Sequence, residues 1–348
     1  MLPQQLLYYF TFNLILLPRI LYAIQGTGNG HLSRARDIIP LLQERASHLD
    51  VLVSGPPADL ALPFPVQYQF HGMGFVFGKS GGISFTKTFG QVNAPAFVRE
   101  MRQLPVEQYD LVINDFEPVS AWACRLRHVP CISLSHQSAV LTKNAPRPKR
   151  PDVVGRMVLR HYAPATAHYG FHFERYDEGT YTPVIRGQVR ALTPANEEHY
   201  TVYLPAYDEA TLVARLRYLS RTTRWEVFSK HSQKEAEYGN VRVRPVSGAA
   251  FTDSLARSAG VLCGAGFETP AEALFLGKKL AVVPMKNQYE QACNAAALAR
   301  MGVPVVKGLK DKHLDGLDQW LQFGEPIPVN YPDETAAVLD KLLREHLK

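Results

Sequence analysis

The sequence predicts an α/β protein with two Rossmann-like lobes, each a mostly parallel sheet with helices on both faces. Three observations predict this class. Short apolar runs alternate with helical patterns along the chain, which is typical of βα units. The 348 residues exceed what a single hydrophobic core usually supports, so about two domains are expected. A hydrophobic fraction of 46% with 20% charged residues favours a globular enzyme over a disordered or fibrous chain.

Each lobe is predicted from its own series of strands and helices. The first series has apolar runs bounded by turn residues, at Ile20–Gln25, Asp50–Ser54, Tyr68–Phe70, Leu111–Asn114 and Cys131–Ser135. Its helical patterns lie at Leu32–Arg45, Asn93–Arg102 and Ser120–Arg127. The second series has strands at Thr201–Leu204, Trp225–Ser229, Val241–Val243, Gly260–Cys263 and Leu280–Val283. Its helices lie at Glu209–Leu219, Ala249–Ala256, Thr269–Leu276 and Gln291–Arg300.

These series define the predicted domains. Residues 19–195 are predicted to form an N-terminal Rossmann-like domain and residues 196–330 a C-terminal Rossmann-like domain, with a hinge near Leu192–His199. Residues 331–348 contain an amphipathic helix that we expect to pack back on the N-terminal lobe. Residues 1–18 are interpreted as an extension outside the core, with a peripheral membrane anchor as the less favoured alternative. Their apolar run is too short for a span that needs about twenty residues.

Charge and cysteine content add weaker constraints. The net charge of +6 fits a generally soluble surface, and the alternative is an anionic partner such as a phosphorylated substrate or an acidic membrane face. Four cysteines without metal-type spacing are expected to be reduced and buried, as in a cytosolic protein: Cys124, Cys131, Cys263 and Cys293. Residues Asn144–Pro151 are predicted to be a loop with a basic tip, because proline removes donors.

The segment from Leu262 to Gly302 holds the most informative pattern. A strand runs into a Gly-rich turn and a helix, and a second strand is followed by a polar step that opens another helix. Backbone N–H groups at a helix start suit phosphates, whereas carboxylate and amide side chains suit sugar hydroxyls. The turn residues are Gly264, Ala265 and Gly266, followed by Thr269 as a phosphate ligand and Glu272 as an acceptor for a ribose diol.

This segment resembles the donor-binding signature of inverting glycosyltransferases of the GT-B fold. The similarity is greatest to the bacterial enzyme that adds N-acetylglucosamine to the peptidoglycan lipid precursor and to the UDP-glucuronosyl and plant UDP-glycosyl transferases. The family pattern falls on Gly266, Thr269 and Glu272, and its sugar-contacting part on Glu290, Gln291, Asn294 and Ala295. Phe251 lies in the region that frames the nucleobase in that family. The plant enzymes carry a histidine where this sequence has Gly264.

The first βα turn, Gly26-Thr27-Gly28-Asn29-Gly30-His31, supplies the second candidate site. Its glycines do not fit G-x-G-x-x-G, and no acid follows the second strand, so an NAD enzyme is disfavoured. We interpret Gly28, Asn29 and Gly30 as an acceptor loop. Arg34, one helical turn beyond His31, is interpreted as a contact for an acidic acceptor or a phosphate, with a surface salt bridge as the alternative. The first motif and the Glu290–Gln291 step together resemble a bacterial branch of GT-B proteins.

An imidazole titrates near neutral pH, so His31 suits a general base. The resemblance implies that His31 takes the proton of the acceptor hydroxyl and that Asp115 orients it. Alternative bases are His136 and Glu117.

The resemblance implies transfer of a sugar, with inversion, from a nucleoside-diphosphate sugar, most simply a UDP-sugar, to a hydroxyl acceptor. It also implies that residues 196–330 bind the donor and residues 19–195 bind the acceptor. It implies no cofactor and no metal, and the sequence has no convincing D-x-D loop. Two alternatives stay open: an isomerase like UDP-N-acetylglucosamine 2-epimerase, and a catalytically silent nucleotide-sugar-binding protein.

The expected location is the cytoplasm, with no nucleic-acid partner. A lipid-linked acceptor and a cell-envelope glycan are the two alternatives for the acceptor, and peripheral contact with the inner face of the membrane is the alternative to a purely cytoplasmic location.

Overall fold

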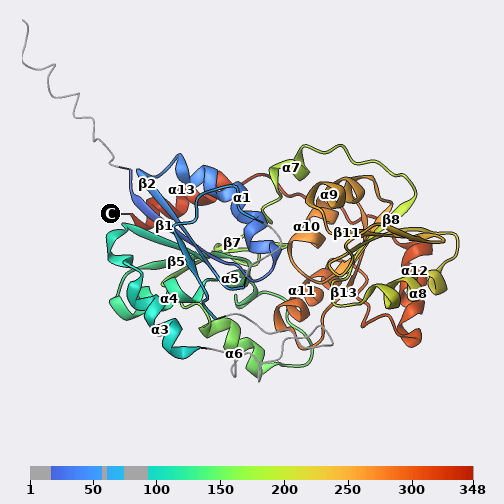
Figure 1. Ribbon diagram of the computed structural model, residues 1–348, viewed down its shortest axis with the longest axis horizontal. Helices are drawn as coiled ribbons and strands as arrows, with labels where there is room; N and C mark the ends of the chain where they lie inside the picture. The colour runs from blue at the N-terminus through green and yellow to red at the C-terminus, as the bar shows by residue number, and fades with distance from the viewer. Residues whose placement is uncertain (1–16, 57–60, 74–92, 348) are drawn as a thin grey trace, which may run out of the picture.

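The computed structural model describes residues 17–56, 61–73 and 93–347. Within these ranges the chain forms two lobes, each built on its own sheet (Figure 1). The predicted α/β class with two Rossmann-like lobes is therefore confirmed. The apolar run that precedes Leu17 lies outside the described residues.

The N-terminal lobe contains fourteen described elements in chain order. They are β1 (Arg19–Gln25), α1 (Asn29–Gln43), β2 (His48–Ser54), β3 (Tyr68–Phe70), α3 (Ala94–Gln103), η2 (Val106–Gln108), β4 (Leu111–Asp115), α4 (Pro118–Arg127), β5 (Cys131–Ser135), α5 (His136–Val140), α6 (Val153–His161), β6 (Ala167–Phe171), β7 (Thr180–Tyr181) and α7 (Gly187–Arg190). The strands β1, β4 and β5 are almost entirely buried and mostly apolar, as expected for parallel strands covered on both faces.

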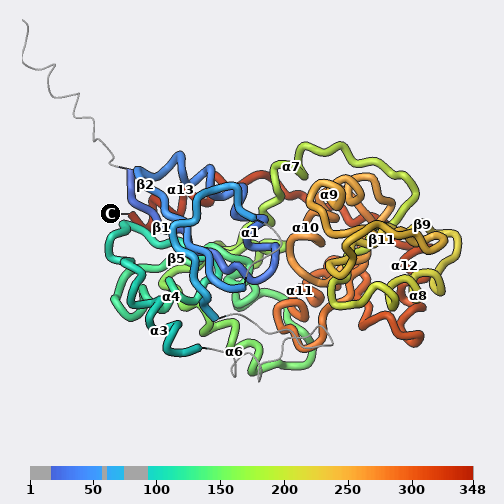
Figure 2. The backbone as a smooth tube through the Cα atoms, in the orientation of Figure 1, coloured from blue at the N-terminus to red at the C-terminus, as the bar shows by residue number. Residues whose placement is uncertain are grey.

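The C-terminal lobe follows after the crossing from α7. Its elements are β8 (His199–Tyr203), α8 (Glu209–Leu219), β9 (Arg224–Ser229), β10 (Ala236–Tyr238), β11 (Val241–Pro245), α9 (Gly248–Arg257), β12 (Gly260–Gly264), α10 (Glu268–Phe275), β13 (Lys279–Val283), α11 (Tyr289–Arg300), η3 (Asp311–His313) and α12 (Leu314–Phe323). The last helix, α13 (Thr335–His346), lies against α1 of the first lobe, where Arg45 pairs with Asp340. The backbone tube shows both passages between the lobes (Figure 2).

The strand order places the loop after β1 at an inner strand of the first sheet and the loop after β12 at an inner strand of the second. The first sheet has the order β3-β2-β1-β4-β5-β6-β7 and the second the order β10-β11-β9-β8-β12-β13, and only β10 pairs antiparallel among the described strands. Successive strands are added to one side of β1 and then, from β4 on, to its other side, and the order reverses in the same way between β8 and β12. Ligands of open α/β sheets bind in the crevice at such a point, outside the carboxyl ends of the strands.

Several elements were not predicted, among them α5, α6, β6 and β7. Strand β6 was not predicted because its sequence, AHYGF, is short and interrupted by glycine. It forms a strand in the structure because it pairs with β5. Helix α6 begins where Asp152 accepts a hydrogen bond from the Gly155 N–H, directly after the predicted basic loop. The strands β6 and β7 depend on pairing with their neighbours in the sheet more than on local periodicity.

Stability should fall in mild acid because His172 is buried in a neutral form. Its Nδ1 accepts a hydrogen bond from the Phe173 N–H at 2.8 Å, so the ring proton lies on Nε2. Burial, reinforced by His136 and Arg300, holds the pKa of His172 well below its usual value. The unfolded state then binds more protons than the folded state below about pH 6.5, so folding stability is present above that pH and is lost as the pH falls.

We expect the free energy of unfolding to drop by about 1 kcal/mol per pH unit for this group below about pH 6.5. Urea unfolding followed by circular dichroism at about pH 7.5 and about pH 5.5 measures it. The variant His172→Asn keeps an acceptor for Phe173 and cannot titrate, so its drop should be smaller than that of the wild type. An equal drop in both proteins would exclude His172 as the source.

Candidate active site

The strand register brings the predicted base and its partner together. Strands β1 and β4 pair in parallel with Ile24 opposite Asp115, so the loop after β1 leaves the sheet beside that carboxylate. Gly28 is the N-cap of α1 and has a φ of 86°, a conformation that disfavours side chains with a Cβ. His31 therefore lies in the first turn of α1, directly above the end of β4.

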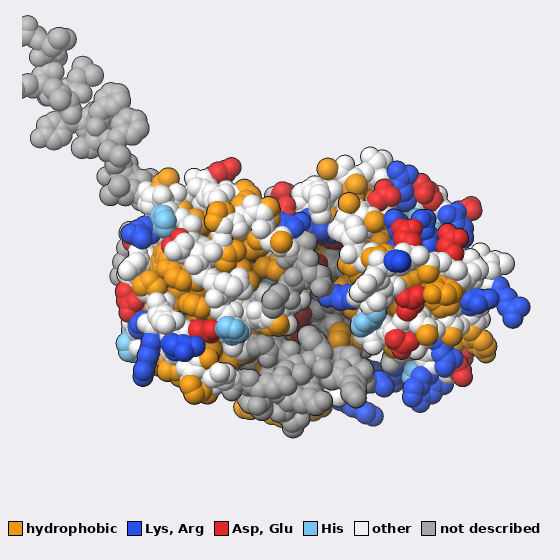
Figure 3. Space-filling model, viewed as in Figure 1, with side chains coloured by type: hydrophobic (Ala, Val, Ile, Leu, Met, Phe, Trp, Pro, Cys, Tyr) orange, Lys and Arg blue, Asp and Glu red, His pale blue; other side chains and the backbone are white. Residues whose placement is uncertain are grey.

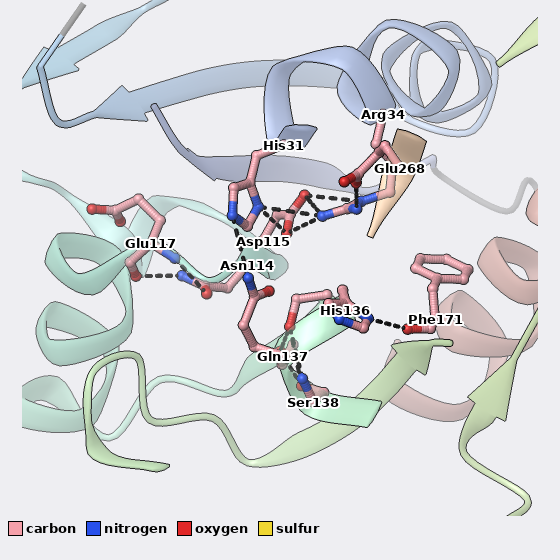
Figure 4. Close-up of polar contacts among 12 residues, drawn as sticks. His31, Arg34, Asn114, Asp115, Glu117, His136, Gln137, Ser138, Phe171 and Glu268 are labelled. Carbon is pink, nitrogen blue, oxygen red and sulfur yellow. Dashed lines mark hydrogen bonds and ion pairs between the residues drawn. The ribbon is translucent and has the colours of Figure 1, made fainter. Parts of the chain in front are cut away.

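His31 and Asp115 form a close pair (Figure 4). The His31 Nδ1 is 2.8 Å from Asp115 Oδ1, and the carboxylate is fully buried. Burial alone raises the pKa of Asp115, but Arg34 and His31 outweigh it and leave the pKa below its ordinary value. Because an ionised carboxylate only accepts hydrogen bonds, the imidazole carries its proton on Nδ1 and presents a lone pair at Nε2.

Arg34 connects this pair to the other lobe. Its guanidinium is buried and donates to both oxygens of Asp115, each at 2.8 Å, and it also pairs with Glu268 at the start of α10. A Cβ at Gly30 would come within 2.7 Å of Glu268 Oε2, so the glycine leaves room for this acid. The acceptor contact expected of Arg34 stays a prediction, because in the structure its hydrogen bonds go to Asp115 and Glu268.

A cavity of about 260 Å³ lies between the lobes in front of His31. Gly28, Gly30 and Arg34 line it from the first lobe, and Glu290 and Gln291 line it from the second. The space-filling view is hollowed between the two lobes (Figure 3). Asn29 is not part of the lining, and its Oδ1 is buried without a hydrogen-bond partner within the described chain.

Gln137, which sequence reasoning missed, stands beside the base. Its Nε2 is 3.4 Å from His31 Nε2 and donates to Glu290 Oε2 at 3.1 Å. The residue follows β5, whose carboxyl end neighbours that of β4 in the sheet. Its position after a parallel strand is the signal that would have identified it.

The two alternative bases have structural partners. Glu117 is buried, caps α4 by accepting from the N–H groups of Val119 and Ser120, and also accepts from Ser54. The His136 ring stacks on Phe267 with centroids 3.9 Å apart, and burial lowers its pKa. Its Nδ1 lies 2.8 Å from the Phe171 carbonyl.

A larger cavity of about 580 Å³ occupies the carboxyl edge of the second sheet. Gly264, Gly266 and Thr269 line it after β12, and the loop after β8 lines the opposite side. Helix α10 has no side-chain cap at its N-terminus, which leaves backbone N–H groups of its first turn available to a ligand. Gly266 and Gln291 line both cavities, so the two spaces adjoin.

Two of the remaining predicted donor residues, Glu272 and Asn294, form contacts between the lobes in this structure. Arg186 donates to both carboxylate oxygens of the buried Glu272, at 2.5 and 2.7 Å. Burial raises the pKa of Glu272, and Arg186 offsets part of that shift. Asn294 is buried; its Oδ1 lies 2.8 Å from His136 Nε2, and its Nδ2 donates to the Ala265 carbonyl.

Phe251 packs against Tyr203 and Phe228. Neither Phe251 nor Glu272 lines either of the two cavities, and their contacts with a nucleoside stay predictions.

The four cysteines are free and buried. In the described ranges, no group of three or more His, Cys, Asp or Glu side chains is arranged to hold a metal ion. Over the same residues no helix has both the length and the apolar character needed to cross a bilayer.

Two facing Rossmann-like lobes with adjoining cavities at the points where the strand order reverses define the class: a protein of the GT-B fold. The family follows from the sequence model that matches residues 18–323, and the chain belongs to glycosyl transferase family 1. No curated protein matches the chain.

Solved structures agree on the fold. UGT2 of Phytolacca americana in complex with UDP-2-fluoro-glucose and pterostilbene matches with a TM-score of 0.57 at 12% identity, covering 94% of each chain. The glycosyltransferase of kitacinnamycin matches with a TM-score of 0.57 at 14% identity, covering 94% of this chain and 99% of that one. SnogD from Streptomyces nogalater matches with a TM-score of 0.50 at 16% identity, covering 93% and 99%.

Proposed function

We propose that the protein transfers a sugar from a nucleoside-diphosphate sugar to a hydroxyl acceptor with inversion at the anomeric carbon. One observation carries the proposal: the imidazole of His31, oriented by Asp115, faces a cavity that adjoins a second cavity at the open N-terminus of α10. A base on one side and an anion-binding helix start on the other are the two groups that a direct displacement needs.

The proposed reaction is a single step. His31 Nε2 takes the proton of the acceptor hydroxyl as its oxygen forms a bond to the anomeric carbon. The bond from that carbon to the diphosphate oxygen breaks, and the nucleoside diphosphate leaves with the electron pair. Backbone N–H groups at the start of α10, together with the Thr269 hydroxyl, stabilise the charge that develops on the leaving group.

Arg34 fixes the carboxylate that orients His31. It donates to both oxygens of Asp115, so the oxygen that faces His31 Nδ1 is held in place.

A uridine nucleotide is the first donor to test, since UGT2 of Phytolacca americana is described with UDP-2-fluoro-glucose. The assay presents a panel of UDP-, GDP-, dTDP- and ADP-sugars and measures the released nucleoside diphosphate, with and without simple hydroxyl acceptors. Release of diphosphate from one donor supports the proposal. A new nucleotide sugar formed from the donor alone would instead indicate an epimerase, and binding without turnover would indicate a silent binding protein.

Removal of the Thr269 hydroxyl should weaken donor binding. Thr269 lines the larger cavity, and the variant Thr269→Val keeps its shape while losing one hydrogen bond to a charged phosphate. Such a bond contributes about 1.5–3 kcal/mol, so we expect a Kd for the nucleoside diphosphate raised by about tenfold to a hundredfold. Isothermal titration calorimetry measures it, with Thr222→Val, exposed and outside both cavities, as the control. An unchanged Kd for Thr269→Val would remove Thr269 from the phosphate site.

A further inference from the structure

Residues 143–160 concentrate the positive charge of the protein. They contain six Lys and Arg residues against one acid, Asp152, and so carry a net charge of +5 out of +6 for the whole chain. The six are Lys143, Arg147, Lys149, Arg150, Arg156 and Arg160. All six are exposed, and none lies within ion-pair distance of a carboxylate in the part of the chain that the structure describes.

The same stretch exposes apolar side chains. Val153, Val154 and Met157 of α6 are 74%, 52% and 56% exposed, and their spacing places them on one side of the helix. Asp152 is held at the helix start as the N-cap, so no acid stands among the three. We call the loop 143–151 and the outer side of α6 the basic-apolar surface.

The inner side of α6 belongs to the active site. Val158 and Leu159 line the cavity in front of His31, and Leu159 is buried in one cluster with Tyr289 and Cys293 of α11. The helix lies at the edge of the molecule beside the junction of the lobes (Figure 1). Its outer side is therefore exposed, while residues of its inner side line the cavity in front of His31.

We propose that the basic-apolar surface docks on an anionic lipid bilayer. Lysine and arginine side chains are attracted to anionic headgroups, whereas valine and methionine side chains gain free energy by entering the boundary of the acyl chains. The net positive charge of this surface favours an anionic partner. Its exposed apolar side chains favour a bilayer over a nucleic acid, because only a bilayer offers an apolar interior. If the proposed sugar transfer holds, the acceptor hydroxyl belongs to a membrane lipid, because docking would place the cavity of His31 next to the bilayer.

Sedimentation of the full-length protein with vesicles tests the docking without any sugar donor, so its outcome is separate from that of the transferase assay. Vesicles of phosphatidylcholine alone are compared with vesicles that contain about one-third phosphatidylglycerol, at low and at high salt. We expect binding to the anionic vesicles that weakens with salt, and little binding to the neutral ones. No binding to anionic vesicles at low salt would overturn the proposal.

Two variants separate charge from apolar insertion. Lys149→Glu/Arg150→Glu/Arg156→Glu should lower the partition coefficient by about tenfold or more, and Val153→Ser/Val154→Ser/Met157→Ser should lower it by about tenfold. Arg217→Glu/Arg221→Glu/Lys234→Glu makes the same charge change on exposed residues of the other lobe and should bind as the wild type does. Equal loss in this control, or unchanged binding of the serine variant, would contradict docking through this surface.

Discussion

Replacing His31 with alanine is expected to lower kcat for sugar transfer by about 10²- to 10⁴-fold, the usual contribution of a positioned general base. The imidazole presents Nε2 to the interlobe cavity, whereas Nδ1 is engaged by Asp115 at 2.8 Å. His31 does not line the larger cavity, so the Kd for the nucleoside diphosphate should stay unchanged. Steady-state kinetics with the best donor and calorimetry with its nucleotide measure both quantities.

The control for this variant is His48→Ala, which removes an exposed imidazole from the outer end of β2. It should leave kcat unchanged. A His31→Ala enzyme with wild-type turnover would show that the base is another group. Loss of nucleotide binding together with turnover would show that His31 supports the fold of the cleft and would remove the argument for a base.

Replacing Arg34 with alanine is expected to lower the free energy of unfolding by about 3–5 kcal/mol, the usual cost of leaving a buried charge without its partner. Asp115 is fully buried, and Arg34 donates to both of its oxygens. The variant also loses the link to Glu268 on the other lobe. Urea unfolding monitored by circular dichroism gives the change in stability.

A double variant tests the cause of this effect. Arg34→Ala combined with Asp115→Ala removes both charges, so it should recover part of the lost stability. Arg45→Ala is the surface control, because its partner Asp340 is 58% exposed and such pairs contribute about 1 kcal/mol or less. If Arg34→Ala lowers the free energy of unfolding no more than Arg45→Ala does, the buried Asp115 carboxylate does not depend on Arg34 for its stability.

The pairing of His31 with Asp115 was predictable because it depends on parallel strands. The glycine loop and the acid each follow an apolar run, and the carboxyl ends of neighbouring parallel strands meet at one edge of the sheet. The Gly264–Thr269 turn was predictable for the same reason, since it follows β12 and opens α10.

The partners of Glu272 and Arg34 were not predictable. Local spacing places Glu272 one turn into α10, where a carboxylate suits a ribose, but Arg186 at the N-cap of α7 occupies both of its oxygens. Arg34 was expected to face a substrate, yet Glu268 reaches it from 234 positions further along the chain. Periodicity describes which side of an element a residue occupies and contains no information about what packs against that side.

The sequence by itself determined the α/β class, most of the strands and helices, and the two loops that end on the sheet edges, because these depend on the 2-residue and 3.6-residue periods and on glycine positions. Only the tertiary structure decided which polar residues line a cavity and which form ion pairs and hydrogen bonds between the lobes. The reason is physical: a carboxylate or guanidinium forms its hydrogen bonds with whichever partner the closed lobes bring within about 3 Å, and that choice depends on the relative placement of two domains.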